Sequence, residues 1–272
     1  MTSNLMLLLN YNAFLLGAII FLAISLSNFI YVWLCKIWKV RILEFSIFLN
    51  PWFSLLKRNI NGVVYKLGWI PMGAYIKPLG MTEEELKDIP AEELPFSFSG
   101  KPRTLKVLFR FAPILVLLFV LLISLFTLKG PGNLFQAISE MYNYMAFAIK
   151  VMFDAHLKSE FVTMTNNMLV DKNIVSFALV IMITVYLVIN LFSTLYAYDE
   201  KKDNKLSKLV SFIVIIFAAY LTFWKIPVFV ISFFSLRQNI TYLVSFFLGL
   251  YLIGVLIFML VMFLIKLTTT KS

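Results

Sequence analysis

Five long apolar stretches limit the possible folds of this 272-residue chain more than any other feature. Each has about 20 mainly apolar residues, the length of a helix that crosses the hydrocarbon core of a bilayer. A helix also pairs its backbone groups internally, as a segment in lipid must. We therefore expect membrane-spanning helices at residues 13–34, 111–128, 174–197, 209–224 and 241–265.

The composition agrees with a mainly α-helical membrane protein. Hydrophobic residues make up 61% of the chain and charged residues only 14%, whereas about a quarter of a soluble domain is charged. The fourth span is the hardest to delimit, because apolar sequence continues past Lys225, and a lysine at the bilayer centre costs ~2.5–3.5 kcal/mol. We end that span near Lys225. Residues 227–236 are then re-entrant, interfacial or part of the same helix, and the sequence leaves these three open.

The basic residues predict the orientation of the chain. Eighteen of the 24 Lys and Arg residues fall in segments that would share one side of the membrane, and the positive-inside rule makes that side cytoplasmic. The N-terminus is then outside and the C-terminus cytoplasmic. We interpret the net charge of +10 in the same way and expect no nucleic-acid partner, because no basic cluster is interleaved with aromatic residues on a soluble module. No basic residue precedes the first apolar run, so we expect a retained span rather than a signal peptide.

The spans divide the chain into residues 1–128, an extracytoplasmic segment at 129–173 and three C-terminal helices within 174–272. In the first part, residues 40–113 interrupt the apolar sequence. Strand-like runs at 40–49 and 63–75 flank a basic segment at 57–62 that ends in Asn61-Gly62, the residues of a tight hairpin turn. We expect a β-hairpin here. A free strand edge in it could accept a guest strand.

The extracytoplasmic segment carries apolar residues at intervals of three and four, which predicts an amphipathic helix. These residues are Leu134, Phe135, Ile138, Met141, Tyr142, Met145, Ile149, Met152 and Phe153. Such a helix could lie on the bilayer, cover a partner protein or pack against the chain's own helices.

Two motifs in residues 40–113 carry a family resemblance. They read Pro71-Met72-Gly73-Ala74-Tyr75-Ile76-Lys77 and Pro95-Phe96-Ser97-Phe98-Ser99-Gly100-Lys101-Pro102. They are similar to the Pro-Leu-Gly-Gly-Tyr-Val-Lys and Pro-Trp-x-Phe-x-x-Lys-Pro sequences of the site-2 protease family of intramembrane zinc metalloproteases. Residues 40–47 look like that family's first strand. The chain thus resembles this family, especially the form found in Bacteroidetes-type bacteria. The resemblance implies a multi-pass protein of the bacterial inner membrane, with a membrane-associated β-hairpin that binds peptide.

The catalytic residues of that family do not carry over. The positions of its His-Glu-x-x-His motif fall on residues 27–31, which hold Ser27, Asn28 and Tyr31 in place of the catalytic three. A hydrolytic zinc site needs three protein ligands and a carboxylate base, and this chain has one histidine. Possible relics of the third-ligand motif are Asn190 and Asp199. We expect no metal, no cofactor and no enzymatic activity: a pseudoprotease.

The predicted function is binding to another membrane protein, as a subunit, assembly factor or regulator of an envelope complex, with the lipid bilayer as the other partner. The expected contact residues are Trp69, Ile70, Met72, Tyr75 and Ile76 on the hairpin, with Phe135, Met141 and Met145 on the outer helix. The alternative is a small transporter or channel component, in which polar residues of the first and third spans line a path. The partner's identity, the stoichiometry and the pathway are not predicted.

Overall fold

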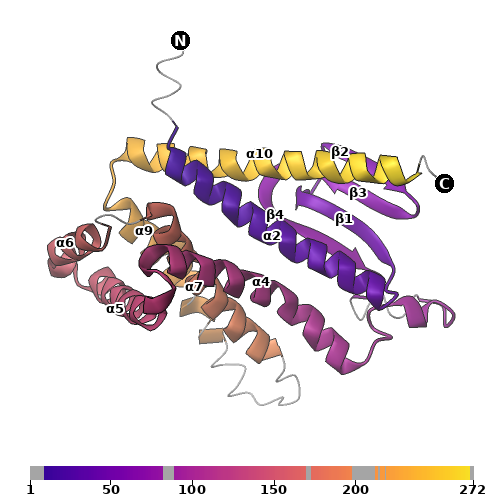
Figure 1. Ribbon diagram of the computed structural model, residues 1–272, viewed down its shortest axis with the longest axis horizontal. Coiled ribbons are helices and arrows are strands. Elements are labelled where there is room, and N and C mark those ends of the chain that lie inside the picture. The colour runs from indigo at the N-terminus through magenta and orange to yellow at the C-terminus, as the bar shows by residue number, and fades with distance from the viewer. Residues whose placement is uncertain are drawn as a thin grey trace, which may run out of the picture. The chain divides into compact units, whose positions relative to one another are not determined.

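A computed structural model of the chain describes residues 9–81, 89–169, 173–197 and 212–269, the last range without residues 214 and 218 (Figure 1). The longer helices are α2 (Tyr11–Ile37), α4 (Arg103–Lys129), α5 (Leu134–Phe153), α6 (Lys158–Leu169), α7 (Ile174–Ala197) and α10 (Leu236–Thr269). Shorter helical pieces are η1 (Leu94–Phe96), η2 (Pro131–Asn133), η3 (Ala155–Leu157), the π-helix η4 (Leu221–Lys225) and α9 (Ile226–Ile231). The strands are β1 (Ile42–Leu49), β2 (Leu56–Ile60), β3 (Val63–Leu67) and β4 (Ile70–Pro78).

The chain is mainly helical with one small sheet, which confirms the fold class at that level. Within the described residues, three helices are long and apolar enough to cross a membrane: α2, α4 and α10. Two of the five predicted spans are not among them. In α7 the described apolar part is the shorter piece Ile174–Leu187, which is not long enough to cross a membrane by itself. The stretch 209–224 lies partly outside the described residues. Helix α4 begins at Arg103, well before the predicted 111, because basic residues end an apolar run without ending a helix.

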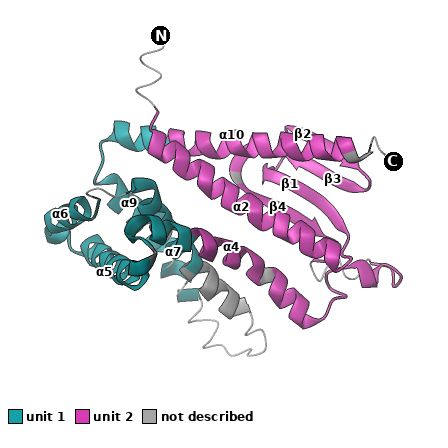
Figure 2. Ribbon diagram, in the orientation of Figure 1, with its two compact units in different colours: residues 1–8, 121–243 teal, residues 9–120, 244–272 magenta. Residues whose placement is uncertain are grey.

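The chain forms two compact units (Figure 2). One comprises residues 9–120 and 244–272, and we call it the sheet unit. The other comprises residues 121–243 together with residues 1–8, which lie outside the described part, and we call it the helical unit.

In the sheet unit, α2 and α10 pack side by side and run parallel (Figure 1). The contacts advance along both helices in the same direction: the Asn10 amide donates to Ser245 Oγ at 2.7 Å, and further along Gly17 lies against the backbone of Phe246 and Leu250. A Cβ atom at Gly17 would lie 2.1 Å from the Phe246 carbonyl oxygen. A Cβ atom added at Gly249 would likewise lie 2.1 Å from the Phe14 carbonyl oxygen. The two backbones can approach this closely because both residues are glycine.

The sheet has the strand order β2-β3-β1-β4. Strand β1 is parallel to β3 and antiparallel to β4, and β2 is antiparallel to β3. The Asn61-Gly62 turn is where the sequence placed it, with φ of 51° and 80°, but it joins β2 to β3. The predicted arrangement of two strands around a basic turn is wrong in two ways. The basic segment is itself strand β2, and residues 63–75 divide at Gly68, where the chain crosses the end of β1.

Gly68 makes this crossing possible. Its amide donates to the Ile47 carbonyl oxygen at 2.8 Å, and a Cβ atom would lie 2.3 Å from the Leu49 carbonyl oxygen. Strands β3 and β4 can therefore flank β1 on opposite sides although two residues separate them. The sequence shows Gly68 within the run 63–75, but it does not show that β1 lies between the two strands into which this run divides.

One face of the sheet packs against α2 and α10. Its core includes Phe45, Ile47 and Ile76 from the sheet with Phe21 of α2 and Phe258 of α10. This is the alternation expected of a sheet with one buried face. The opposite face carries Glu44, Ser46, Lys66 and Tyr75, the residues that alternate with the buried set.

The sheet lies beside the C-terminal half of α2. Ile42, at the start of β1, packs with the cluster that contains Leu34, whereas Phe48 contacts the Phe21 ring at a centroid distance of 5.3 Å. Thirteen helical residues from Leu34 back to Phe21 span about 20 Å. Six strand steps from Ile42 to Phe48 also span about 20 Å. Strand β1 therefore runs back along α2 from its C-terminal end to near its middle.

The helical unit is built around a core from α4, α5, α6 and α7, with Tyr144 and Phe161 near its centre. The Tyr144 hydroxyl lies 3.1 Å from Thr165 Oγ1, which joins α5 to α6. Burial raises the pKa of Tyr144, and the hydrogen bond to Thr165 partly offsets that rise. Lys225, the residue that makes the fourth span ambiguous, donates to the Met152 carbonyl oxygen at 3.1 Å and lies over the Phe153 ring. Its charge therefore meets the C-terminal end of α5.

Candidate functional site

Ser27, Asn28 and Tyr31, the residues that the resemblance aligns with the zinc motif, lie on the side of α2 that faces the sheet and α4. Ser27 Oγ donates to the Ala23 carbonyl oxygen at 3.0 Å, within α2. The Tyr31 ring stacks on Phe109 of α4 at 4.2 Å between centroids. Ser27 and Asn28 are buried. Among the residues that the structure describes, no group of three or more His, Cys, Asp or Glu side chains is placed to hold a metal ion.

Asn28 joins α2 to the sheet. Its side-chain amide donates to the Ile24 carbonyl oxygen at 3.0 Å and to the Ala74 carbonyl oxygen of β4 at 3.2 Å. Ile47 directs its carbonyl oxygen toward Gly68, on the β3 side of β1. The opposed pair Ile47–Ala74 is thus not hydrogen-bonded across the antiparallel ladder, so the backbone groups of Ala74 face away from β1. Asn28 therefore occupies a carbonyl on the outer edge of the sheet.

The two edge strands differ in chemistry. Strand β4 has nine residues, and those before Lys77 carry no charge: Ile70, Pro71, Met72, Gly73, Ala74, Tyr75 and Ile76. Strand β2 has five residues with the exposed bases Lys57 and Arg58, and charges on an edge discourage strand addition. By side-chain chemistry β4 suits an apolar guest strand better than β2, although α2 packs against β4 and Asn28 already bonds the Ala74 carbonyl oxygen of its edge.

A polar network covers part of the sheet face opposite the core. Lys66 Nζ lies 2.5 Å from Glu44 Oε2, and the Tyr75 hydroxyl donates to the other Glu44 oxygen. The same hydroxyl lies 3.0 Å from Asn50 Oδ1, and Asn50 donates to Ser54 at 2.8 Å. The Glu44 and Lys66 side chains are only 14% and 21% exposed, so the pair is largely withdrawn from solvent. The network joins β1, β3 and β4 on this face.

Three aromatic residues form a stack beside the turns that follow β1 and β3: Trp52, Phe53 and Trp69. The Trp69 ring is stacked with Trp52 and with Phe53, with centroid distances of 5.6 and 5.7 Å. Trp52 is 80% exposed, whereas the Trp69 Nε1 atom is buried without a hydrogen-bond partner. This end of the sheet therefore presents aromatic surface.

The predicted contact residues of the hairpin have different environments. Trp69 is in the stack, Ile70 is half-buried, and the Tyr75 hydroxyl is held by the polar network. Ile76 is 9% exposed and belongs to the core against α2 and α10, so its side chain offers little contact surface. The side chain of Met72 lies outside the described part of the chain. The sheet brings these residues onto one strand and its preceding turn, but on both faces.

The predicted contact residues of the outer helix also separate. Phe135 is 87% exposed and Met145 is half-buried, whereas Met141 is 5% exposed and lies in the core of the helical unit. Burial thus argues against direct contact by Met141, because its position in the three-to-four pattern faces the neighbouring helices. The possible relics Asn190 and Asp199 cannot be compared with the structure, since the Asn190 side chain and all of Asp199 lie outside the described residues.

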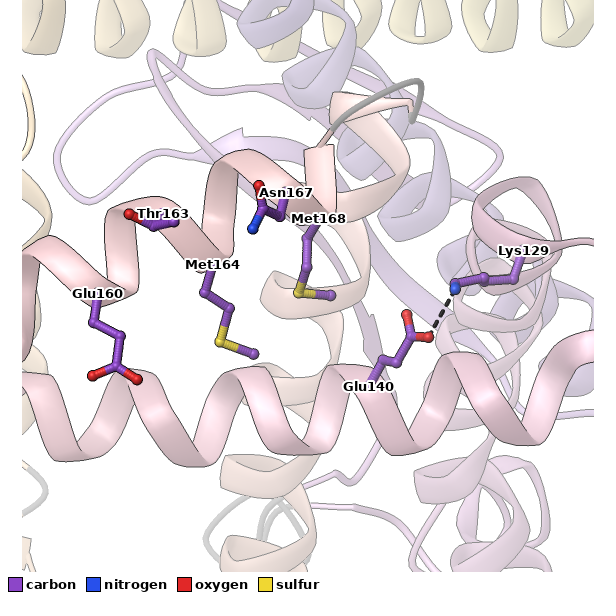
Figure 3. Close-up of a pocket in the computed structure, with 7 residues that line it drawn as sticks. All are labelled: Lys129, Glu140, Glu160, Thr163, Met164, Asn167 and Met168. Atoms are coloured by element: carbon purple, nitrogen blue, oxygen red, sulfur yellow. Dashed lines mark hydrogen bonds and ion pairs between the residues drawn. The ribbon is translucent and has the colours of Figure 1, made fainter.

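A groove that the sequence did not indicate runs between α5 and α6 (Figure 3). It has a volume of about 510 Å³ and is lined by Lys129, Glu140, Glu160, Thr163, Met164, Asn167 and Met168. The Lys129 ammonium lies 2.7 Å from Glu140 Oε1, so this carboxylate is already paired. The groove combines thioether, amide and carboxylate groups, but its separate residues give no recognisable spacing in the sequence.

The sequence was also compared with known proteins. No protein-family model matches the chain, and a search of curated proteins finds no match.

Proposed function

We propose that this protein is a non-catalytic, site-2-protease-like membrane protein that binds another membrane protein along strand β4. In this proposal it acts as a subunit, assembly factor or regulator of an envelope complex in a bacterial inner membrane. The observation that carries the proposal is the hydrogen bond from Asn28 to the outer edge of β4. This bond joins Asn28, which the resemblance aligns with the zinc motif, to the strand that would hold a client.

The neutral chemistry around these positions supports a binding role. Ser27 and Asn28 bond to backbone carbonyls, and Tyr31 stacks on an aromatic ring. None of these groups takes a proton from water near neutral pH, as a hydrolytic base must. With a single histidine in the sequence, the three-ligand zinc site of the resembled family has no candidate set.

The environment of the sheet supports a client in an extended conformation. Strand β1 runs back beside the apolar α2 helix, so β4 lies next to a segment long and apolar enough to cross a membrane. Backbone groups at such a depth need partners from protein or water. An unwound segment of a client would supply these partners by adding a strand to β4, with apolar side chains that match Ile70 and Ala74.

Photo-cross-linking in native membranes tests this proposal. A photoreactive amino acid would replace Ile70 on β4 or, as a matched control, Arg58 on the opposite edge strand β2. We expect one discrete adduct with a membrane protein from position 70 and none from position 58. Equal labelling from both positions, or no adduct from position 70, would contradict strand addition at β4. One zinc ion per purified chain would contradict the non-catalytic assignment.

The structure gives less support to the transport alternative. That function requires polar groups of the first and third spans to line a path, yet Ser27 and Asn28 donate to backbone carbonyls in the described part of α2. Flux in proteoliposomes that contain only this chain would revive it.

A further inference from the structure

We propose that α5 lies in the boundary between membrane and water, with one apolar side against lipid acyl chains. We call that side the α5 stripe; it consists of Phe135, Ile138, Tyr142, Met145, Ile149 and Phe153. The inference does not depend on the proposed function, because it concerns the helical unit and would hold for a protein with any client.

The helix has three distinct sides. At 100° per residue, the α5 stripe occupies an arc of about 80°. The buried residues Ala137, Met141, Tyr144 and Val151 occupy a second arc of about 80°, centred roughly 120° from the first. The polar residues Gln136, Ser139, Glu140, Asn143 and Lys150 fill the remaining side. Leu134 and Met152 lie between the two apolar arcs, so the apolar surface of α5 is continuous and covers about 200°, more than the part buried in its own bundle.

No described residue covers most of the α5 stripe. Phe135 is 87% exposed, Tyr142 is 72% exposed, and Ile149 and Phe153 are 56% and 57% exposed. A row of large apolar side chains along a whole 20-residue helix is more than scattered surface hydrophobics account for. The stripe also contains Tyr142, and tyrosine is enriched at the membrane–water boundary because its ring is apolar and its hydroxyl is polar.

Both ends of α5 are tied to the ends of apolar segments, which makes lipid the favoured occupant. Its first residue follows the last residue of α4 by five positions, and Lys129 of α4 pairs with Glu140 at 2.7 Å. At the other end, Lys225 donates to the Met152 carbonyl oxygen where the apolar stretch 209–224 ends. A helix held at both ends in this way lies along the membrane face, with its polar side toward water.

This placement changes the role expected for two residues. Phe135 and Met145 were predicted to contact a partner protein, but both belong to the α5 stripe. In the membrane they would contact acyl chains, and the partner-binding surface would be confined to the sheet unit.

Site-directed labelling in proteoliposomes tests the orientation. Single-cysteine variants of the full chain, in a Cys35→Ala background, would carry a fluorophore at Tyr142 or Asn143, and in a second pair at Ile149 or Lys150. Neighbouring residues share a position along the helix but lie on its apolar and polar sides. Each label would be quenched separately by nitroxides on lipid acyl chains and by a water-soluble paramagnetic complex.

We expect labels at 142 and 149 to be quenched severalfold more by the acyl-chain nitroxides, and labels at 143 and 150 more by the aqueous complex. Equal aqueous quenching within both pairs would mean that the stripe faces water and would overturn the proposal. Protection of 142 and 149 from both quenchers would mean that protein covers the stripe, which also overturns it.

Discussion

The close approach of α2 and α10 gives the sharpest test of the sheet unit. In Gly17→Ala, the added methyl carbon would lie 2.1 Å from the Phe246 carbonyl oxygen, 3.0 Å from its carbon and 3.2 Å from the Leu250 nitrogen. All three are backbone atoms, and an ordinary contact between such a carbon and oxygen is about 3.3 Å. The helices must therefore separate by about 1 Å, because no rotamer change can relieve a backbone clash.

The expected cost follows from this displacement. Overpacking of this kind costs about 1–3 kcal/mol. The better helix propensity of alanine opposes it by up to about 1 kcal/mol. The clash also strains neighbouring contacts of the α2–α10 interface, including the hydrogen bond from the Asn10 amide to Ser245, so we expect a net loss of about 1–3 kcal/mol in the free energy of unfolding, or roughly 5- to 150-fold in the folding equilibrium.

Unfolding in mixed micelles of mild detergent and dodecyl sulfate, followed by tryptophan fluorescence, would measure this loss. Gly249→Ala should give a similar value, since its methyl carbon would lie 2.1 Å from the Phe14 carbonyl oxygen. The double variant should cost less than the sum, because the first substitution already opens the interface. Gly132→Ala is the matched control, as nothing lies within 4 Å of its added carbon. Stability within about 0.5 kcal/mol of the wild type in both interface variants would refute the parallel packing of α2 and α10.

Three further substitutions address other contacts. Asn28→Leu should lower the free energy of unfolding by about 1 kcal/mol in the same assay, because it leaves a β4 edge carbonyl without its donor. Glu44→Gln should cost about 2 kcal/mol, since it leaves a largely buried ammonium unpaired, whereas Glu93→Gln in an exposed pair should cost under about 0.5 kcal/mol. Burial raises the pKa of Tyr144 in the folded state, so stability is full below pH about 10 and falls as the pH rises further. Tyr144→Phe should flatten that alkaline loss, as stability measured from pH 8 to 12 would reveal.

The sequence predicted helices α2 and α10 well because a single physical requirement governs them. Burial of about 20 residues in lipid leaves a long, uninterrupted signal, and α2 and α10 contain the predicted stretches with a few residues added at each end. The added residues include polar and basic ones such as Lys36 and Arg237. Such residues are compatible with a helix, but a prediction from hydropathy ends the span before them.

Contacts between segments far apart in the chain were beyond the sequence. The Asn61-Gly62 turn is local, and it was predicted correctly. The position of β1 in the sheet, beside β2 or between β3 and β4, depends on long-range packing. The alternation of apolar and polar residues along a strand does not reveal it. The same limit applies to Gly17 and Gly249. Gly17 is the only glycine of α2, and Gly249 is one of two in α10. Neither sequence position shows that the two glycines face each other, because that contact forms only when the helices pack.

The exposed and buried apolar residues of α5 show where periodicity stops being informative. Phe135 and Met141 fit the same three-to-four pattern, yet one is 87% exposed and the other 5%. When the apolar side of a helix is wider than one neighbouring helix can cover, the sequence does not show which part of it contacts protein. The contacts of α4 and α7 decide it, because they take the side that includes Met141.

The parallel packing of α2 and α10 also constrains the segments between them. Two spans that run in the same direction must be separated by an odd number of crossings, since each crossing reverses the chain. If α4, which is long and apolar enough to span, provides one crossing, then α7 and the apolar stretch 209–224 either both cross or both remain on one side. The second arrangement would leave two apolar segments, of 24 and 16 residues, outside the hydrocarbon core that their composition suits. The first arrangement is the five-span topology that the sequence predicts, and it stays a prediction because residues 198–211 lie outside the described part of the chain.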